Sequence, residues 1–180
     1  MLSADDDGPL NARAASGDRA AFQTLVLRHE ARLRAFLGRL GGTASGDELA
    51  QETFLRAWLR AGDYRGQGSY AAWLMGIGWR LFLDDARRER RRNALWDGGG
   101  AADELAITPA ASEATLDVNK LLGLLLPQQR AAIILCDGHG WSHGEAAQIM
   151  GVPLGTVKSL ILRGKQRLRA HLAEIDDDGR

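Results

Sequence analysis

A basic segment near the C-terminus contains the side chains best suited to bind nucleic acid. Residues 154–168 carry Lys and Arg but no acid. Lys and Arg neutralise phosphates, and short polar side chains can reach base edges in a DNA groove. Helical spacing puts the following side chains on its outer side: Thr156, Lys158, Ser159, Leu162, Arg163, Lys165 and Gln166. This pattern favours DNA binding over a merely solvated helix face.

Two other groups of residues raise the possibility of catalysis or metal binding. Cys136, His139 and His143 are spaced like zinc ligands, but three ligands leave a structural site incomplete. A loop cysteine and two surface histidines are the favoured interpretation. Paired acids occur around Asp47 and Glu52, but no histidine, nucleophile or ligand set accompanies them. We therefore predict no enzyme, no metal and no cofactor; a small metal-dependent hydrolase is the alternative.

The basic segment is preceded by signals for a helix-turn-helix. Ser142 and Glu145 form an S-x-x-E capping box at the start of a short helix. Gly151 can end that helix in the left-handed conformation, and Pro153 suits the start of the next one. An inward apolar stripe follows at helical spacing: Val157, Leu160, Ile161, Gly164 and Leu168. A short helix, a tight turn and a basic second helix form the unit that reads the major groove.

The rest of the sequence predicts an all-α protein. Helical periodicity covers residues 20–40, 46–61, 70–91, 116–126 and 127–136. We expect two small helical domains joined by a flexible acidic linker. The expected divisions are a disordered tail at 1–18, a first domain at 19–92, a linker at 93–116, a helix-turn-helix domain at 117–175 and an acidic tail at 176–180.

The charge is zero overall but unevenly distributed. Residues 1–92 have a net charge of +3, residues 93–117 of −5 and residues 118–180 of +2. Such alternating blocks suggest parts that face different partners. No long apolar run predicts membrane insertion, and no apolar signal segment opens the sequence. The single cysteine fits the reducing cytoplasm, which is the expected location.

The C-terminal motifs resemble a known family. SHGEAAQIMGVPLGTVKSLILRGKQRL, residues 142–168, is similar to the helix-turn-helix of bacterial extracytoplasmic-function sigma factors. LLGLLLPQQRAAIIL, residues 121–135, resembles the helix pair before it, with its Leu-Pro-x-x-x-Arg. The resemblance implies a region 4-like domain that contacts the −35 element of promoters.

Two N-terminal motifs strengthen this resemblance. DELAQETFLRAW (Asp47–Trp58) is similar to the family's helix that docks on the clamp coiled coil of RNA polymerase. The residues expected to bind there are Asp47, Glu48, Gln51, Glu52 and Leu55. YRGQGSYAAWLMGIGWRLFLDDARRERRR (Tyr64–Arg92) is similar to its promoter-melting loop and helix. The implied −10 contacts are Arg65, Gln67, Ser69, Trp79, Arg80, Arg87, Arg88 and Arg91.

The resemblance therefore predicts a sigma region 2-like bundle and a region 4-like domain in an alternative sigma factor. Its implied partners are core RNA polymerase (the clamp coiled coil of β′ and the flap of β), promoter DNA and an anti-sigma factor. Within the promoter-melting helix, Tyr70 and Trp73 are expected in the core, and Trp79, which lies off the apolar stripe, is expected to be exposed.

The sequence departs from the family pattern at several positions. Trp79-Arg80 replaces a common Arg-Asn, which changes the expected −10 preference. Leu160 stands where an Arg is usual, which would remove a DNA contact, and Gly164 replaces a common Ala. Two alternatives share many of these features: a sigma-like mimic that binds an anti-sigma factor without promoter activity, and a helix-turn-helix activator that does not dock on polymerase.

Overall fold

The computed structural model describes residues 7–41, 43–96 and 113–178, and every regular element in these ranges is a helix. The first group of elements comprises α1 (Asp7–Ala15), α2 (Arg19–Gly41), α3 (Thr43–Leu59), the short turn η2 (Ala61–Asp63) and α4 (Tyr70–Trp96). The second comprises α5 (Glu113–Gly123), α6 (Pro127–Ile133), the π-helical turn η3 (Ile134–Gly138), α7 (His143–Met150) and α8 (Leu154–Asp178). The all-α prediction is confirmed. The central part of the expected linker, residues 97–112, lies outside the described residues.

The first domain is a bundle in which α2 packs between its neighbours. Leu33, Phe36 and Leu37 of α2 are fully buried. The backbones of α2 and α3 approach closely, because a Cβ added at Gly46 would lie 2.5 Å from the backbone nitrogen of Gly38. The apolar stripe predicted for α3 faces inward, with Ala50 and Ala57 fully buried.

The prediction of a disordered tail over residues 1–18 is wrong for α1. Asp7 is 4% exposed, and its carboxylate accepts hydrogen bonds from Arg28 at 2.9 Å and pairs with the His29 ring at 2.8 Å. Asn11 donates to the carbonyl of Ala61 at 2.8 Å. These anchors join residues far apart in sequence, so helical periodicity gives no sign of them.

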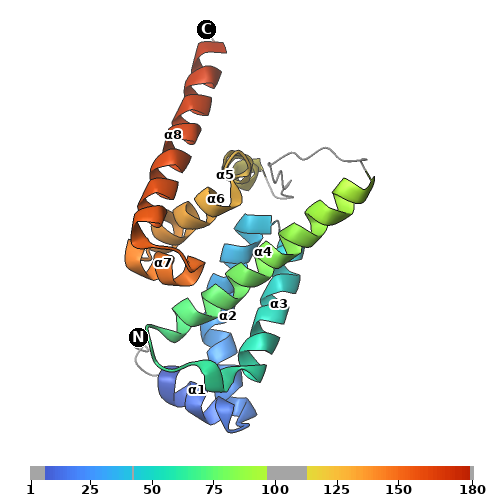
Figure 1. Cartoon of the computed structure of the whole chain (residues 1–180), viewed down its shortest axis with the longest axis vertical. Coiled ribbons are helices and arrows are strands. Elements are labelled where there is room, and N and C mark those ends of the chain that lie inside the picture. The colour runs from blue at the N-terminus through green and yellow to red at the C-terminus, as the bar shows by residue number, and fades with distance from the viewer. Residues whose placement is uncertain (1–6, 42, 97–112, 179–180) are drawn as a thin grey trace.

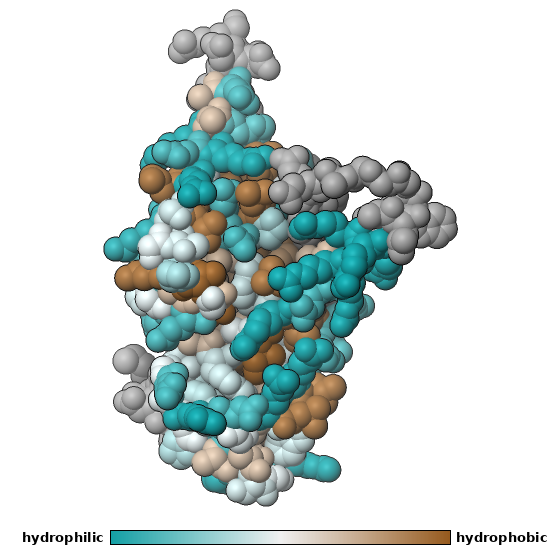
Figure 2. Space-filling model, viewed as in Figure 1, coloured by the Kyte–Doolittle hydropathy of each residue, from teal (hydrophilic) through white to brown (hydrophobic). Residues whose placement is uncertain are grey.

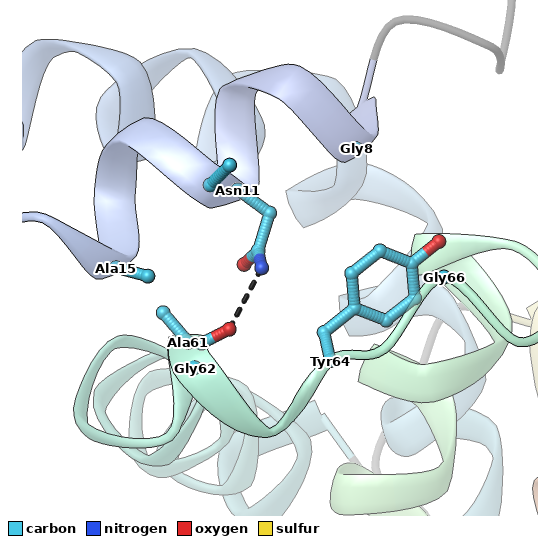
Figure 3. Close-up of a pocket in the computed structure, with 8 residues that line it drawn as sticks. Gly8, Asn11, Ala15, Ala61, Gly62, Tyr64 and Gly66 are labelled. Atoms are coloured by element: carbon cyan, nitrogen blue, oxygen red, sulfur yellow. Dashed lines mark hydrogen bonds between the residues drawn. The ribbon is translucent and has the colours of Figure 1, made fainter.

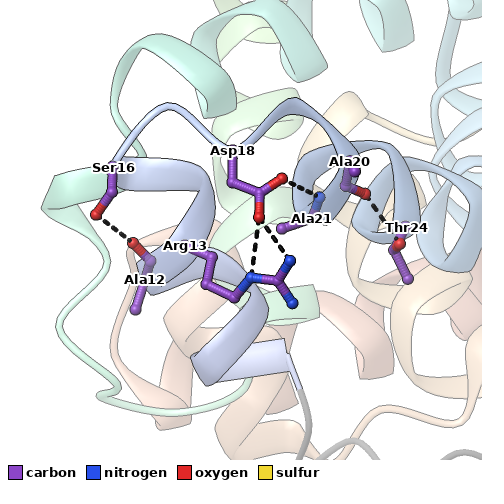
Figure 4. A network of polar contacts seen from close by, with 7 residues as sticks. All are labelled: Ala12, Arg13, Ser16, Asp18, Ala20, Ala21 and Thr24. Atoms are coloured by element: carbon purple, nitrogen blue, oxygen red, sulfur yellow. Dashed lines mark hydrogen bonds and ion pairs between the residues drawn. The ribbon is translucent and has the colours of Figure 1, made fainter.

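A polar turn connects α1 to α2 (Figure 4). The Asp18 carboxylate accepts from the backbone N–H of Ala21 at 3.0 Å and from Arg13 at 2.6 Å. The first bond caps the N-terminus of α2, where backbone N–H groups otherwise lack partners.

The second domain is the predicted helix-turn-helix preceded by α5 and α6. Ser142 accepts from the Glu145 N–H at 3.2 Å, and the Glu145 carboxylate accepts from the Ser142 N–H at 2.9 Å. Gly151 ends α7 in the left-handed region, with φ of 67°. Both signals are confirmed. Helix α8 continues to Asp178, through most of the predicted acidic tail, and projects beyond α5 and α6 (Figure 1).

The two domains share one continuous core, because α4 packs on both. On one side, a Cβ at Gly78 would meet Leu33 and Thr53 at 3.2 Å. On another, a Cβ at Gly76 would lie 3.4 Å from the backbone oxygen of Ile149 in α7. Both glycines weaken an isolated helix. Gly78 lets α4 approach α2 and α3 closely, whereas at Gly76 an added Cβ would be in ordinary contact with α7. Figure 1 shows α7 lying against α4.

Candidate nucleic-acid and polymerase interfaces

The basic face of α8 is open to solvent, as the spacing predicts. Val157, Leu160 and Ile161 are buried against the domain. Lys158 and Arg163 are exposed on the other side, and Leu162 is 57% exposed. The half-buried Ser159 donates to the carbonyl of Thr156 at 2.9 Å, and Lys165 pairs with Asp137 at 2.9 Å. The face therefore combines cations with one apolar side chain.

Leu160 does not lie on this basic face. It is 8% exposed and belongs to the inward stripe. The expectation that this leucine removes a DNA contact is therefore wrong, because a side chain here points into the domain. Gly164 is also buried, and a Cβ there would lie 2.7 Å from the Cδ1 of Ile133. The glycine thus allows close contact between α8 and α6.

The second half of α4 carries a dense positive surface. Arg87, Arg88, Arg90, Arg91 and Arg92 are all exposed. Arg87 pairs with Asp84 at 3.4 Å and Arg92 pairs with Glu89. Figure 2 shows hydrophilic side chains covering this part of the molecule. Arginines this close repel one another unless anions lie between them, which makes the surface suited to phosphates.

The loop before α4 is shaped by two glycines and a cap. Gly66 and Gly68 adopt positive φ values of 71° and 82°. The Ser69 hydroxyl accepts from the Ala72 N–H at 3.1 Å, so its first role is to cap α4. Arg65 and Gln67 of the same loop are exposed to solvent.

A cavity of about 390 Å³ lies between α1 and this loop (Figure 3). Its lining consists of Gly8, Asn11, Ala12, Ala15, Ala61, Gly62, Tyr64 and Gly66. The Asn11 amide points across it to Ala61, and the Tyr64 hydroxyl donates to the Gly68 carbonyl at 2.9 Å. Helix α1, which the sequence did not predict, therefore contacts the turn η2 that leads into the loop.

The aromatic residues of α4 are mostly internal. Tyr70 is 1% exposed, and burial together with the charge of Asp7 raises the pKa of its hydroxyl. Trp73 is half-buried and packs at 5.4 Å from the Tyr70 ring. Both core predictions are confirmed.

The prediction that Trp79 is exposed is wrong. Trp79 is 2% exposed and stacks on Phe82 with ring centroids 5.7 Å apart. It lies one turn after Gly76, on the side of α4 that α7 covers. The apolar stripe read from the spacing of α4 does not include this residue. The next residue, Arg80, is exposed, and its Nε donates to the Gly76 carbonyl at 2.9 Å.

The predicted docking face on α3 combines acids with an exposed apolar side chain. Leu55 is 53% exposed, and Asp47, Glu48 and Gln51 are exposed beside it. Asp47 pairs with Arg34 at 2.5 Å, and the half-buried Glu52 pairs with Arg56 at 2.8 Å. The sequence analysis missed Leu59, which is 72% exposed one turn after Leu55. The i, i+4 spacing of the two leucines was the available signal.

His139 contacts the first domain. Its ring packs edge-on against Phe36 at 6.4 Å. Burial, followed by the charges of Arg32 and Arg39, lowers the pKa of His139 from 6.5 to about 4. Among the residues that the structure describes, no group of three His, Cys, Asp or Glu side chains is arranged to hold a metal. Across the same residues, no helix is both long and apolar enough to span a membrane.

Comparisons with known families match both domains. The model of Sigma-70 region 2 matches residues 25–92, and that of Sigma-70, region 4 matches residues 115–168. The ECF RNA polymerase sigma factor SigE of Mycolicibacterium smegmatis is 36% identical over 170 residues, covering 89% of this chain and 66% of SigE. The ECF RNA polymerase sigma factor SigM of Mycobacterium tuberculosis is 34% identical over 174 residues, covering 94% of this chain and 86% of SigM.

Two solved structures resemble the fold. The sigma factor RpoE, in complex with the anti-sigma factor NepR from Bartonella quintana, matches with a TM-score of 0.69 and 32% identity, covering 84% of this chain and 96% of that chain. CnrH, in complex with the cytosolic domain of CnrY, matches with a TM-score of 0.69 and 29% identity, covering 96% and 99%.

Proposed function

Because the chain belongs to the extracytoplasmic-function group of RNA polymerase sigma factors, we propose that it binds core RNA polymerase and directs it to particular promoters. The observation that supports this most is that one chain carries both an open basic face on α8 and an acid-and-leucine face on α3. A DNA-binding activator needs only the first face. The proposed role is regulatory, in the cytoplasm, and involves no covalent chemistry.

The α3 face is proposed to bind the clamp coiled coil of the polymerase β′ subunit. Leu55 and Leu59 present the apolar anchors, which supply affinity when they become buried. Asp47, Glu48 and Gln51 surround them and set orientation by charge and hydrogen bonding. Glu52 is already paired with Arg56 and has a supporting role. The helix-turn-helix domain is proposed to meet the flap of β.

The DNA contacts divide between the two domains. Lys158, Arg163 and Lys165 would neutralise phosphates at the −35 element, and Thr156, Ser159 and Leu162 would face the bases. At the −10 element, Arg65 and Gln67 would contact unstacked bases, while the exposed arginines of α4 hold the backbone. Ser69 acts there by capping α4.

An anti-sigma factor is the proposed regulator. The solved structure of the sigma factor RpoE, 32% identical to this chain, contains the anti-sigma factor NepR, and that of CnrH, 29% identical, contains the cytosolic domain of CnrY. A sigma-like mimic would bind an anti-sigma factor without selecting promoters. The open basic face of α8 favours promoter selection, because a mimic does not use that face.

Binding to purified core polymerase tests the proposal. Leu55→Asp places a desolvated charge at the docking face, so we expect the affinity to fall at least roughly tenfold. Leu27→Asp is the matched control, because Leu27 is 66% exposed on α2, outside this face. Affinity is measured by titrating labelled protein with core polymerase at low and moderate salt. Equal affinities for the two variants, or no binding by the unmodified chain, would overturn the docking proposal.

A further inference from the structure

The outward side of α8 carries an uncharged line of residues along its middle. In an α-helix of 3.6 residues per turn, positions spaced by three and four residues fall on one line. Val157 and Ile161 point into the domain and are buried. The positions opposite that buried stripe form what we call the central line: Gly155, Ser159, Leu162 and Gln166.

The cations of α8 lie on both sides of the central line. By the same spacing, Lys158 and Lys165 fall on one side and Arg163 falls on the other. A helix with its side chains is about 10–12 Å across, and the major groove is about 12 Å wide. A helix in that groove therefore turns its two sides toward the phosphates of the groove walls and its central line toward the base edges. The cations then contact phosphates, which set position, and the central line contacts bases, which set specificity.

Leu162 is the apolar side chain of the central line. It is 57% exposed and lies just over two turns after Leu154, where α8 begins, in the part of a recognition helix that reaches base edges. Its neighbour Ser159 is half-buried, and its hydroxyl already donates to the Thr156 carbonyl at 2.9 Å, so it can only accept from a base while that bond is kept. The exposed apolar surface at this point of the line therefore belongs to Leu162.

The chemistry of the major groove gives a leucine one favourable partner. Guanine, adenine and cytosine present hydrogen-bond donors and acceptors there, whereas thymine adds the methyl group on its C5 carbon. A leucine over cytosine would displace water from the N4 amino group without replacing the lost hydrogen bond. A leucine over thymine buries two apolar groups against each other.

We propose that Leu162 is a specificity-determining residue, whose side chain contacts the 5-methyl group of one thymine in the −35 element and makes thymine the preferred base at that position. The inference rests on the proposed function and names the base that this site reads. Thr156 also carries a methyl group, but it is half-buried at the edge of the basic face.

Replacing thymine by uracil tests the contact, because uracil lacks only the methyl group. The probe is a duplex promoter at which the unmodified chain initiates with core polymerase, with each thymine of the −35 element replaced singly by uracil. We expect one of these replacements to weaken binding of the polymerase complex roughly fourfold, the ratio that burying one methyl group gives. Equal binding to all the uracil duplexes, or a −35 element without thymine, would overturn the inference.

Leu162→Ala assigns the methyl contact to this side chain. In a double-mutant cycle, the variant should respond little to the same uracil, because the apolar partner of the methyl group is already gone. Leu172→Ala is the matched control: Leu172 is 47% exposed on α8, beyond the basic face, so this variant should keep the full uracil effect. An equal uracil effect in Leu162→Ala would assign the methyl contact to another side chain and overturn the inference.

The outcomes separate this inference from the proposed function. Initiation at discrete promoters without a uracil effect refutes the inference and leaves the proposed function standing. No initiation by the unmodified chain refutes the proposed function, and the inference with it. Weaker binding of Leu162→Ala to core polymerase, with no uracil effect in the unmodified chain, would assign Leu162 to a protein contact instead.

Discussion

At the scale of single residues, the structure gives a new role to side chains that the sequence presents as isolated. His139 looks like an incomplete metal ligand in the sequence, yet its ring fills a gap against Phe36 and its carbonyl binds Arg32. In the sequence, Trp79 looks like an exposed ring on which a DNA base could stack, yet it is buried. The contacts of His139 come from the other domain, so sequence spacing within one helix cannot show them.

The low pKa of His139 makes the packing of the two domains sensitive to acid. While the ring is packed against α2 this pKa is about 4, and it returns toward 6.5 when the ring is exposed to solvent. Between these values the exposed ring takes up a proton that the packed ring does not. The contact between the domains therefore keeps its full stability above pH 6.5 and loses stability as the pH falls toward 4. Asp137 and Glu145, in the second domain, are the nearby acids.

Scattering at neutral pH and at about pH 5 measures this effect. We expect the radius of gyration of the unmodified chain to increase in acid. His139→Phe keeps a ring against Phe36 but cannot titrate, so its size should change much less. An identical response of the two proteins would show that other groups control the change in size.

At the scale of elements, most helices follow from local signals. Local signals specify α7 and α8: the capping box of Ser142 and Glu145 begins α7, Gly151 ends it, and the apolar stripe that starts at Val157 defines the buried side of α8. Helix α1 and the turn η3 were not predicted. Asp7 and Asn11 hold α1 by bonds to residues 21 to 50 positions away, which no local pattern reveals. Within the candidate site, the basic face of α8 and the exposed Leu55 on α3 were predicted from the sequence. The exposure of Leu59 and the contact of α1 with Ala61 became visible only in the structure.

The crossing of α2 and α3 depends on glycine at position 46. A Cβ there would lie 2.5 Å from backbone atoms of Gly38, and backbone cannot move aside as a side-chain tip can. We expect Gly46→Ala to lower the free energy of unfolding by about 2 kcal/mol or more. Gly155→Ala is the control: nothing lies within 4 Å of an added Cβ there, so the helix should gain up to about 1 kcal/mol. Urea unfolding compares them; equal stabilities would contradict the close crossing.

At the scale of the whole molecule, the sequence predicted two domains and their order but not how they sit together. Each domain has its own apolar stripes, and the two cores are continuous across α4. The interface depends on a few contacts, such as Arg130 to the end of α2 and Gly76 to α7. From the sequence alone, an arginine such as Arg130 or a helical glycine such as Gly76 can have many different roles. Only the fold shows that they meet across domains.

The central claim is that the acid-bearing face of α3 binds polymerase while positive surfaces in both domains bind the promoter. Transcription with core polymerase and a genomic promoter library tests it most directly. We predict initiation at discrete sites that share two sequence elements, lost on Lys158→Ala with Arg163→Ala and retained on Arg19→Ala with Arg60→Ala, which removes equal charge from exposed positions of the first domain. Polymerase binding without initiation at selected promoters would contradict the claim.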